Sequence, residues 1–152
     1  MSVLAPGSAV PEFTLKDSEQ EDFTSATLPP KAILAFFPFA FSSVCTDQFT
    51  LYENELVGEL DAAGVTLYGV STDGVPSQIA FREKLGFSFA LLSDFEPKGE
   101  TARKFGAYFE PAGMTNRALV AVADGEVKWS WIGNSPGDLP GPELIREAIS
   151  AL

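Results

Sequence analysis

The sequence contains a single cysteine, Cys45, and no histidine. Without histidine the chain can form neither a Ser-His-Asp triad nor a Cys-His pair, and it has no imidazole general base. One cysteine can neither form an intrachain disulfide nor complete a zinc site of the Cys/His type. The glycine-containing stretch 133–141 has no lysine and no phosphate-binding spacing. We therefore expect no metal and no cofactor. The side chains that could be catalytic are carboxylates, lysines, tyrosines and the one thiol.

The position of Cys45 favours a reactive thiol. It follows candidate helix caps at Ser42 and Ser43, so it falls in the first turn of a predicted helix. Free backbone N–H groups and the positive end of the helix dipole stabilise a thiolate, which is the nucleophilic form of cysteine. Pro38 offers no N–H and can wall off one side of the sulfur. A lone cysteine is also often a small buried apolar residue, and the residues alone leave both interpretations open.

The residues around Cys45 resemble a known active-site motif. Pro38-x-x-x-Ser42-x-x-Cys45 is similar to the Pro-x-x-x-(Thr/Ser)-x-x-Cys motif of the peroxiredoxins, and it follows an apolar strand, as in that family. Asn116-Arg117 opens a late strand, where peroxiredoxins place an active-site arginine. The length and the single cysteine most resemble the one-cysteine, alkyl hydroperoxide reductase E-like branch.

The resemblance implies a role for each matched residue. Cys45 would be the nucleophile that attacks the peroxide, and Ser42 would hold the peroxide oxygens. Arg117 would bind the peroxide and favour the thiolate, while Pro38 would shield the pocket. The backbone N–H groups of Val44 and Cys45 would also donate to the substrate.

The sequence departs from the family at Gln48, where peroxiredoxins commonly carry a glutamate that orients the arginine. The amide can still accept a hydrogen bond from Arg117, but it brings no negative charge, so we expect a more electropositive site. Aromatic and apolar residues on loops near the motif favour an interface or an apolar wall for the substrate. The aromatic and apolar residues on these loops are Phe39, Phe41, Tyr108, Phe109 and Met114. The resemblance implies a homodimer.

The chain alternates strand and helix patterns. Apolar runs and turn residues predict strands, and apolar spacings of three and four residues predict helices, in the order β-β-α-β-α-β-α-β-β-α. The predicted segments are 13–16, 32–37, 43–63, 65–70, 76–85, 89–92, 97–105, 117–122, 127–132 and 142–152. This order predicts one α/β domain over 1–152, with a mixed sheet covered by helices on both faces. It resembles a thioredoxin-like fold with an N-terminal strand extension.

Two other acidic segments are interpreted as structural. We predict that Ser71-Thr72-Asp73-Gly74 is a turn and helix cap. Asp94-Phe95-Glu96 holds two carboxylates, but no flanking apolar residues raise their pKa values, so the sequence favours a solvated turn.

Composition restricts the partners. Ten Lys and Arg against 21 Asp and Glu give a net charge of −11, which repels nucleic acid and anionic membranes. The first residues show no signal-peptide pattern, and the longest apolar stretch, 32–41, is interrupted by Pro38. We expect a soluble, cytoplasmic protein.

The favoured hypothesis is a thiol-dependent peroxidase acting on hydrogen peroxide and organic hydroperoxides. With no second cysteine, its sulfenic acid needs an external thiol, which can be a small thiol, a glutaredoxin-like protein or thioredoxin. The alternatives are a redox-sensing or binding module without efficient turnover, and a structural protein with an inert cysteine.

Overall fold

The computed structural model describes residues 2–152. Its centre is a seven-stranded sheet in the order β2-β1-β5-β4-β3-β8-β9. The strands are β1 (Thr14–Lys16), β2 (Asp22–Thr24), β3 (Lys31–Phe36), β4 (Thr66–Ser71), β5 (Ala90–Ser93), β8 (Ala118–Ala123) and β9 (Glu126–Ile132). Strands β3, β4 and β5 are parallel, and antiparallel strands flank them on both sides. The predicted mixed sheet is confirmed.

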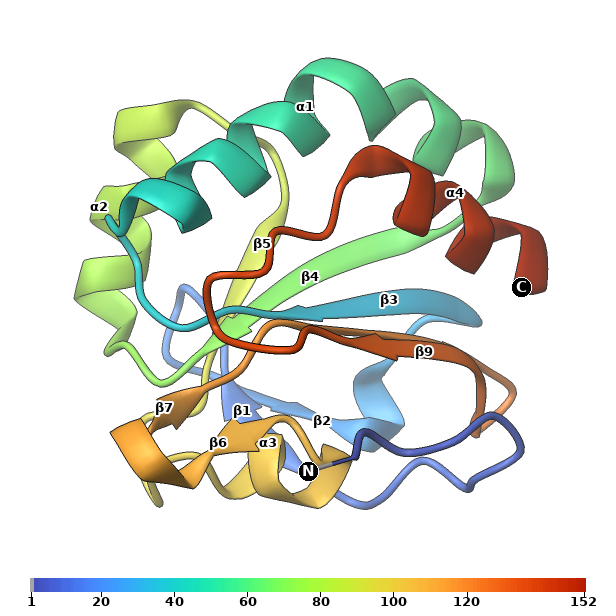
Figure 1. The fold of residues 1–152 in the computed structure, drawn as a ribbon, viewed down its shortest axis with the longest axis horizontal. Coiled ribbons are helices and arrows are strands. Elements are labelled where there is room, and N and C mark those ends of the chain that lie inside the picture. Colours follow the sequence, from blue (N-terminus) through green and yellow to red (C-terminus); the bar gives the residue numbers. More distant parts are fainter. Residues whose placement is uncertain (1) are drawn as a thin grey trace.

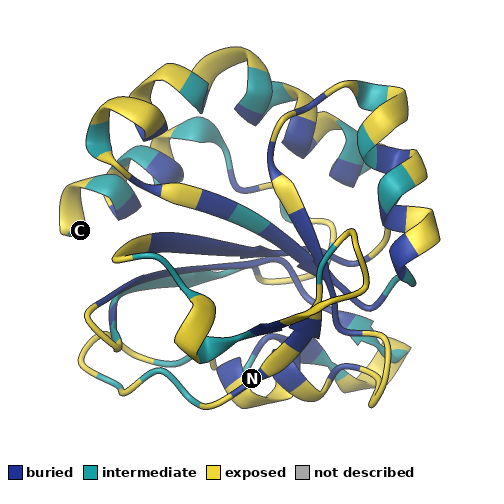
Figure 2. Cartoon of the chain, turned by 180° about the vertical axis from the view of Figure 1, so that it is seen from behind, coloured by how far each residue is buried: buried dark blue, intermediate teal, exposed yellow. Residues whose placement is uncertain are grey.

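Helices cover both faces of this sheet, as predicted (Figure 1). The helices are α1 (Ser43–Ala63), α2 (Val75–Leu85), α3 (Glu100–Phe105) and α4 (Pro142–Ala151). Side chains of α1, α2 and α4 share one apolar cluster with Ile33, Ala35 and Phe37. The alternate residues of β3 pack with α3 and the N-terminal segment in a second cluster on the opposite face. The dark interior of the sheet in Figure 2 marks β3 and its neighbours as the centre of the core.

The structure adds elements that the sequence pattern did not predict. The short strand β2 follows the polar turn after β1, and a small hairpin joins β6 (Tyr108–Phe109) to β7 (Met114–Thr115) in the predicted loop before β8. Single 3₁₀ turns lie at Ser25–Thr27 and Glu110–Ala112. These strands have only two or three residues, too few to show an alternating pattern in the sequence.

Helix α1 is delimited as its sequence predicts. Ser42 is the N-cap, in an extended conformation, and Gly64 ends the helix with a left-handed φ of 68°. The contact between α1 and the sheet requires a glycine in β4. A Cβ atom on Gly69 would lie 2.5 Å from Leu91 Cδ2 and 2.9 Å from Phe49 Cζ, so Gly69 allows α1 to pack closely against the sheet.

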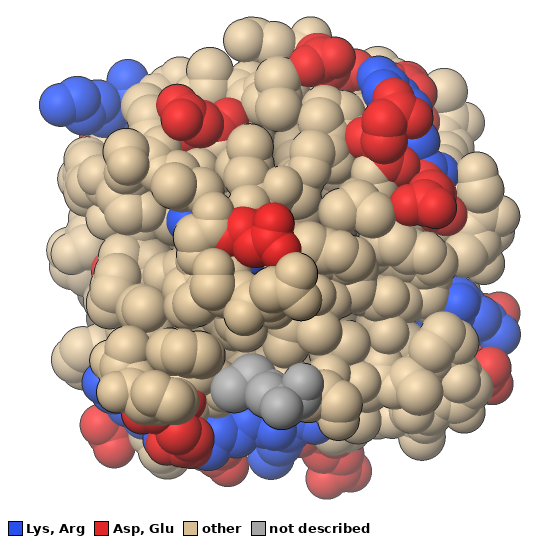
Figure 3. Space-filling model, viewed as in Figure 1, with Lys and Arg blue, Asp and Glu red and all other residues tan. Residues whose placement is uncertain are grey.

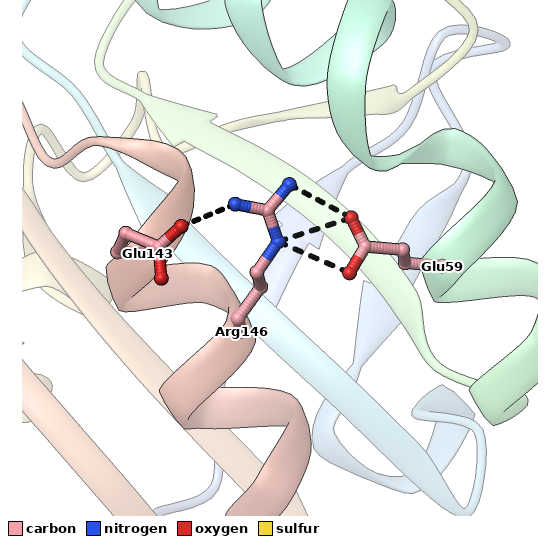
Figure 4. A network of polar contacts seen from close by, with 3 residues as sticks. All are labelled: Glu59, Glu143 and Arg146. Atoms are coloured by element: carbon pink, nitrogen blue, oxygen red, sulfur yellow. Dashed lines mark hydrogen bonds and ion pairs between the residues drawn. The ribbon is translucent and has the colours of Figure 1, made fainter.

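A network of ion pairs joins α1 to α4 at the surface (Figure 4). Arg146 of α4 donates to both carboxylate oxygens of Glu59 in α1 and to Glu143 one turn earlier in α4. Hydrogen bonding to Glu59 and Glu143 raises the pKa of Arg146, and the same contact lowers the pKa of Glu59. These groups are solvent-exposed, so the network orients α4 more than it stabilises the fold.

Charged side chains stand in separate groups on the face shown in Figure 3, with much uncharged surface between them. No continuous basic stripe crosses this face. Among residues 2–152, no helix is long and apolar enough to cross a membrane.

Candidate active site

The topology of the sheet brings Cys45 and Arg117 together from positions 72 residues apart. Strand β3 leads into the loop that begins α1, and Arg117 directly precedes β8. Because β3 and β8 are antiparallel with Phe36 opposite Ala118, the end of β3 lies beside the start of β8. The first turn of α1 therefore lies close to Arg117, the residue directly before β8.

Arg117 binds the sulfur of Cys45 directly. Its Nη2 donates to Cys45 Sγ over 2.9 Å. Both residues are buried, with relative exposures of 0% for Cys45 and 2% for Arg117. A buried guanidinium is stable only beside an anion or several acceptors, and the sulfur is one of the acceptors that Arg117 contacts. The sulfur is thus enclosed but not surrounded by hydrocarbon alone.

Ser42, Val44, Pro38 and Phe39 lie on the segment that leads from β3 into the first turn of α1. The Oγ of Ser42 accepts a hydrogen bond from the Cys45 N–H over 3.3 Å, which is the interaction of an N-cap. Val44 lies half-buried in the same turn, and Pro38 is buried immediately after β3. Phe39 is largely exposed and lies on the loop between them. All the predicted site residues therefore lie on two neighbouring segments.

Gln48 accepts a hydrogen bond from a second nitrogen of the Arg117 guanidinium. Nη1 of Arg117 donates to Gln48 Oε1 over 2.6 Å, and Nε donates to the carbonyl of Pro136 over 2.7 Å. Each of the three guanidinium nitrogens of Arg117 thus donates a hydrogen bond, and Cys45 Sγ accepts one of the three.

Tyr52 extends this network and was not predicted as a site residue. Gln48 Nε2 donates to Tyr52 Oη over 3.2 Å, and Tyr52 donates to the carbonyl of Pro140 over 2.6 Å. Burial raises the pKa of Tyr52, so the phenol keeps its proton. Its spacing in the sequence matched the buried face of α1. The only available signal was chemical, because a buried tyrosine hydroxyl needs a partner.

Asp73 has a role different from the predicted cap. Ser71 is the last residue of β4, Thr72 and Asp73 form a bend, and Gly74 is the N-cap of α2 without a side-chain hydrogen bond. Asp73 Oδ2 instead accepts the N–H of Ala40 over 2.8 Å and the hydroxyl of Ser71 over 2.7 Å. Asp73 therefore anchors the loop that carries Phe39 and Ser42.

The prediction of a solvated turn at 94–96 is wrong for Asp94. Glu96 is exposed, but Asp94 is buried and accepts the N–H groups of Thr101 and Ala102 at the start of α3. Burial raises the pKa of Asp94 to about 6, and the two backbone hydrogen bonds oppose that rise. The carboxylate turns inward because α3 begins with free N–H groups that need an acceptor.

The expected group of exposed aromatic side chains is only partly present. Phe39 and Phe41 are exposed, and the ring of Phe41 packs edge-on against Phe81. Phe41 has a left-handed φ of 69°, directly before the cap of α1. Phe109 and Met114 are half-buried. Tyr108, in the β6–β7 hairpin, is buried, and the guanidinium of Arg103 from α3 covers its ring.

A separate cleft of about 960 Å³ lies between the N-terminal hairpin and the segment after β5. Its lining includes Lys16, Asp94 and Lys104 but neither Cys45 nor Arg117. No group of three or more potential metal-ligating His, Cys, Asp or Glu side chains occurs within residues 2–152.

The architecture and the site together define a thioredoxin-like protein with one buried thiol bonded to an arginine. The AhpC/TSA family model matches residues 6–130. Alkyl hydroperoxide reductase E of Mycobacterium tuberculosis is 29% identical over 153 residues, covering 99% of each chain. Peroxiredoxin Bcp of Escherichia coli is 29% identical over 136 residues, covering 84% of this chain and 85% of that protein.

Solved structures show the same fold. Peroxidoxin BcpB from Mycobacterium tuberculosis superimposes with a TM-score of 0.79 at 25% identity, covering 96% of this chain and 94% of that one. AhpC of the same organism gives a TM-score of 0.85 at 18% identity, covering 99% and 93%. The chain belongs to the AhpC/TSA family, as a peroxiredoxin with a single cysteine. The predicted family and fold are confirmed.

Proposed function

We propose that this protein is a thiol-dependent peroxidase that reduces hydrogen peroxide and organic hydroperoxides. The observation that carries the proposal is the 2.9 Å contact between Arg117 Nη2 and Cys45 Sγ inside the core. Relatives named alkyl hydroperoxide reductase E and peroxiredoxin Bcp support this reaction class.

The reaction needs no general base once the thiol is ionised. The Cys45 thiolate attacks one peroxide oxygen, the O–O bond breaks, and an S–O bond forms. The other oxygen leaves as hydroxide or alkoxide and takes up from solvent the proton that the thiol released on ionising, so the products are Cys45 sulfenic acid and water or alcohol. Negative charge moves along the S–O–O axis, and a fixed guanidinium beside that axis stabilises it without reorganising.

The other site residues have supporting roles in this proposal. Ser42 and the backbone N–H groups of Val44 and Cys45 bind the peroxide oxygens. Pro38 shields the sulfur because it offers no competing donor, and Phe39 supplies apolar surface for an organic hydroperoxide. Ser42 Oγ accepts the Cys45 N–H over 3.3 Å, so the hydroxyl proton of Ser42 is free to donate to the peroxide, and only the Cys45 N–H must exchange its partner to bind the substrate.

The sulfenic acid is reduced from outside the chain, because the sequence has no second cysteine. One external thiol condenses with the sulfenic acid to a mixed disulfide and releases water. A second thiol then restores Cys45 and leaves as a disulfide. A small thiol, a glutaredoxin-like protein or thioredoxin can serve, and a reducing compartment such as the cytoplasm suits this cycle. Phe39 and Phe41 supply exposed apolar surface for a homodimer.

A Cys45→Ser variant tests the proposal. We expect it to lose peroxide consumption, because the hydroxyl of serine is not ionised at neutral pH. Stopped-flow fluorescence of Trp129 and Trp131 follows oxidation in the parent, and turnover is measured with each candidate reductant. Ser43→Ala is the matched control, because Ser43 is exposed in the same turn. Peroxide consumption that persists in Cys45→Ser contradicts the proposal, and oxidation without turnover by any thiol favours a sensing role.

A further inference from the structure

Arg117 has three hydrogen-bond acceptors: two uncharged oxygens and the sulfur of Cys45. Its partners are the amide oxygen of Gln48, the carbonyl of Pro136 and Cys45 Sγ. Within residues 2–152, none of the ion pairs includes Arg117. No carboxylate therefore neutralises the guanidinium, and its positive charge acts on the sulfur of Cys45 and on whatever binds beside it.

An amide at position 48 creates a problem that a carboxylate does not have. A carboxylate presents an oxygen on either side, whereas a glutamine amide presents an oxygen on one side and an NH₂ donor on the other. If the amide of Gln48 turned over, its NH₂ group would face the donors of Arg117. The site therefore needs a device that fixes which side of the amide faces the arginine.

The hydrogen bonds of Tyr52 supply that device. The carbonyl of Pro140 can only accept, so the single proton of the Tyr52 hydroxyl is directed to it. The phenol oxygen is then left as an acceptor, and only the NH₂ side of Gln48 can satisfy it. Oε1 of Gln48 must therefore face Arg117. Because Gln48 and Tyr52 are both buried, water does not compete for these bonds.

We propose that Tyr52 is a positioning residue of the active site: its hydroxyl, bonded to the Pro140 carbonyl, fixes the orientation of the Gln48 amide so that an uncharged oxygen holds Arg117 against Cys45. The inference rests on the proposed function and adds to it a residue that touches neither the sulfur nor the peroxide. It also assigns a role to the 133–141 loop, which supplies the carbonyls for Tyr52 and for Nε of Arg117.

A double-mutant cycle on Tyr52 and Gln48 tests the proposal. Tyr52→Phe removes only the hydroxyl, so the amide of Gln48 loses the group that sets its orientation. We expect the rate of Cys45 oxidation by hydrogen peroxide to fall about five- to tenfold, the effect of one buried hydrogen bond. In a Gln48→Glu background we expect Tyr52→Phe to change that rate less than about twofold, because a carboxylate has two equivalent oxygens and no orientation to set.

Two further variants complete the test. Tyr68→Phe removes a phenol oxygen from a half-buried tyrosine of β4 outside this network, and we expect no change in the rate. Gln48→Glu places a negative charge beside Arg117. We expect a smaller fraction of Cys45 to be thiolate at neutral pH, measured by its ultraviolet absorbance in the folded protein.

The outcomes separate the possibilities. An equal loss from Tyr52→Phe in both backgrounds shows a purely structural role and overturns the proposal, as does no loss in the Gln48 parent. If Tyr52→Phe does not fold, a Gln48→Glu thiolate fraction equal to or above that of the parent overturns it. If Cys45 does not react with peroxide in any variant, the proposed function fails. The role of Tyr52 is then decided by the thiolate absorbance of the four proteins: a loss caused by Tyr52→Phe in the Gln48 parent but not in the Gln48→Glu background supports it, and an equal effect in both backgrounds overturns it.

Discussion

Arg117 uses its planar shape as much as its charge. Its three hydrogen bonds run in three directions, to Gln48, Pro136 and Cys45. A lysine would keep the charge but could not hold these acceptors in one plane.

We therefore expect Arg117→Lys to slow oxidation of Cys45 by hydrogen peroxide roughly 10- to 100-fold, since a hydrogen bond to a charged group contributes about 1.5–3 kcal/mol. Single-turnover fluorescence measures the rate. Arg82→Lys is the control, because Arg82 of α2 also donates to backbone carbonyls, those of Phe87 and Ser88 between α2 and β5. Equal rates for Arg117→Lys and the parent would show that charge alone suffices.

The sequence predicted those parts of the site that belong to a local motif. Pro38, Ser42 and Cys45 lie within eight residues of one another, and Gln48 lies one turn further along the same helix. Tyr52 could not be recognised because its acceptor, Pro140, lies 88 residues away in a loop without a motif. A hydrophobic pattern marks a position as buried but does not say that its hydroxyl has a specific partner.

The packing of α1 on β4 depends on Gly69, and this gives a prediction at the scale of the helix. We expect Gly69→Ala to lower the free energy of unfolding by roughly 1–3 kcal/mol, because its Cβ would collide with Leu91 and Phe49. Gly58 is exposed within α1, and a Cβ there meets nothing within 4 Å. Gly58→Ala should therefore raise stability by about 0.5–1 kcal/mol. Urea unfolding measures both, and destabilisation by Gly58→Ala would contradict this account.

The start of α3 gives a pH-dependent prediction through Asp94. Because burial raises its pKa in the folded state to about 6, the folded protein binds a proton that the unfolded chain releases. This contribution to stability is present at low pH and is lost as pH rises through about 6. We expect the free energy of unfolding of the parent, relative to Asp94→Asn, to fall by on the order of 2–3 kcal/mol across this range.

Urea unfolding of both proteins from pH 3 to pH 7 covers that change, because the loss begins near the ordinary carboxyl pKa of 3.8 and is complete above about 6. Glu96→Gln is the matched control, because Glu96 is exposed in the same turn and should show no such dependence. A constant difference between the parent and Asp94→Asn would show that the buried carboxyl is ionised throughout.

At the scale of the whole molecule, the alternation of strand and helix patterns was sufficient to predict the order of the main elements. The predicted strand at 117–122 lies at 118–123, and the predicted helix at 97–105 begins only at Glu100. The β6–β7 hairpin was not predicted, because two-residue strands are defined by their pairing and not by a sequence period. The position of Arg117 beside Cys45 follows from the order of strands, which only the resemblance suggested.

The composition of the whole chain also predicts the form of the pH profile. The sequence has no histidine, and Ser42 and Gln48 do not titrate near neutrality. Burial raises the pKa of Tyr52, so its proton stays in place. We expect the rate of peroxide reduction to show no falling limb up to about pH 9, because none of these groups loses a proton that the reaction needs. Stopped-flow measurements across this range check it, and a bell-shaped profile would reveal a second titrating group.

The complete burial of Cys45 separates the two halves of the proposed cycle. A hydroperoxide needs only a narrow passage to reach the sulfur, because two small oxygens must enter. A protein reductant must bring a second sulfur into line with the first, which requires a wider opening around Cys45. Oxidation of Cys45 therefore needs only a small opening of the site, whereas its reduction by a protein thiol needs a larger and rarer one. With a large reductant, this larger opening limits the rate of turnover.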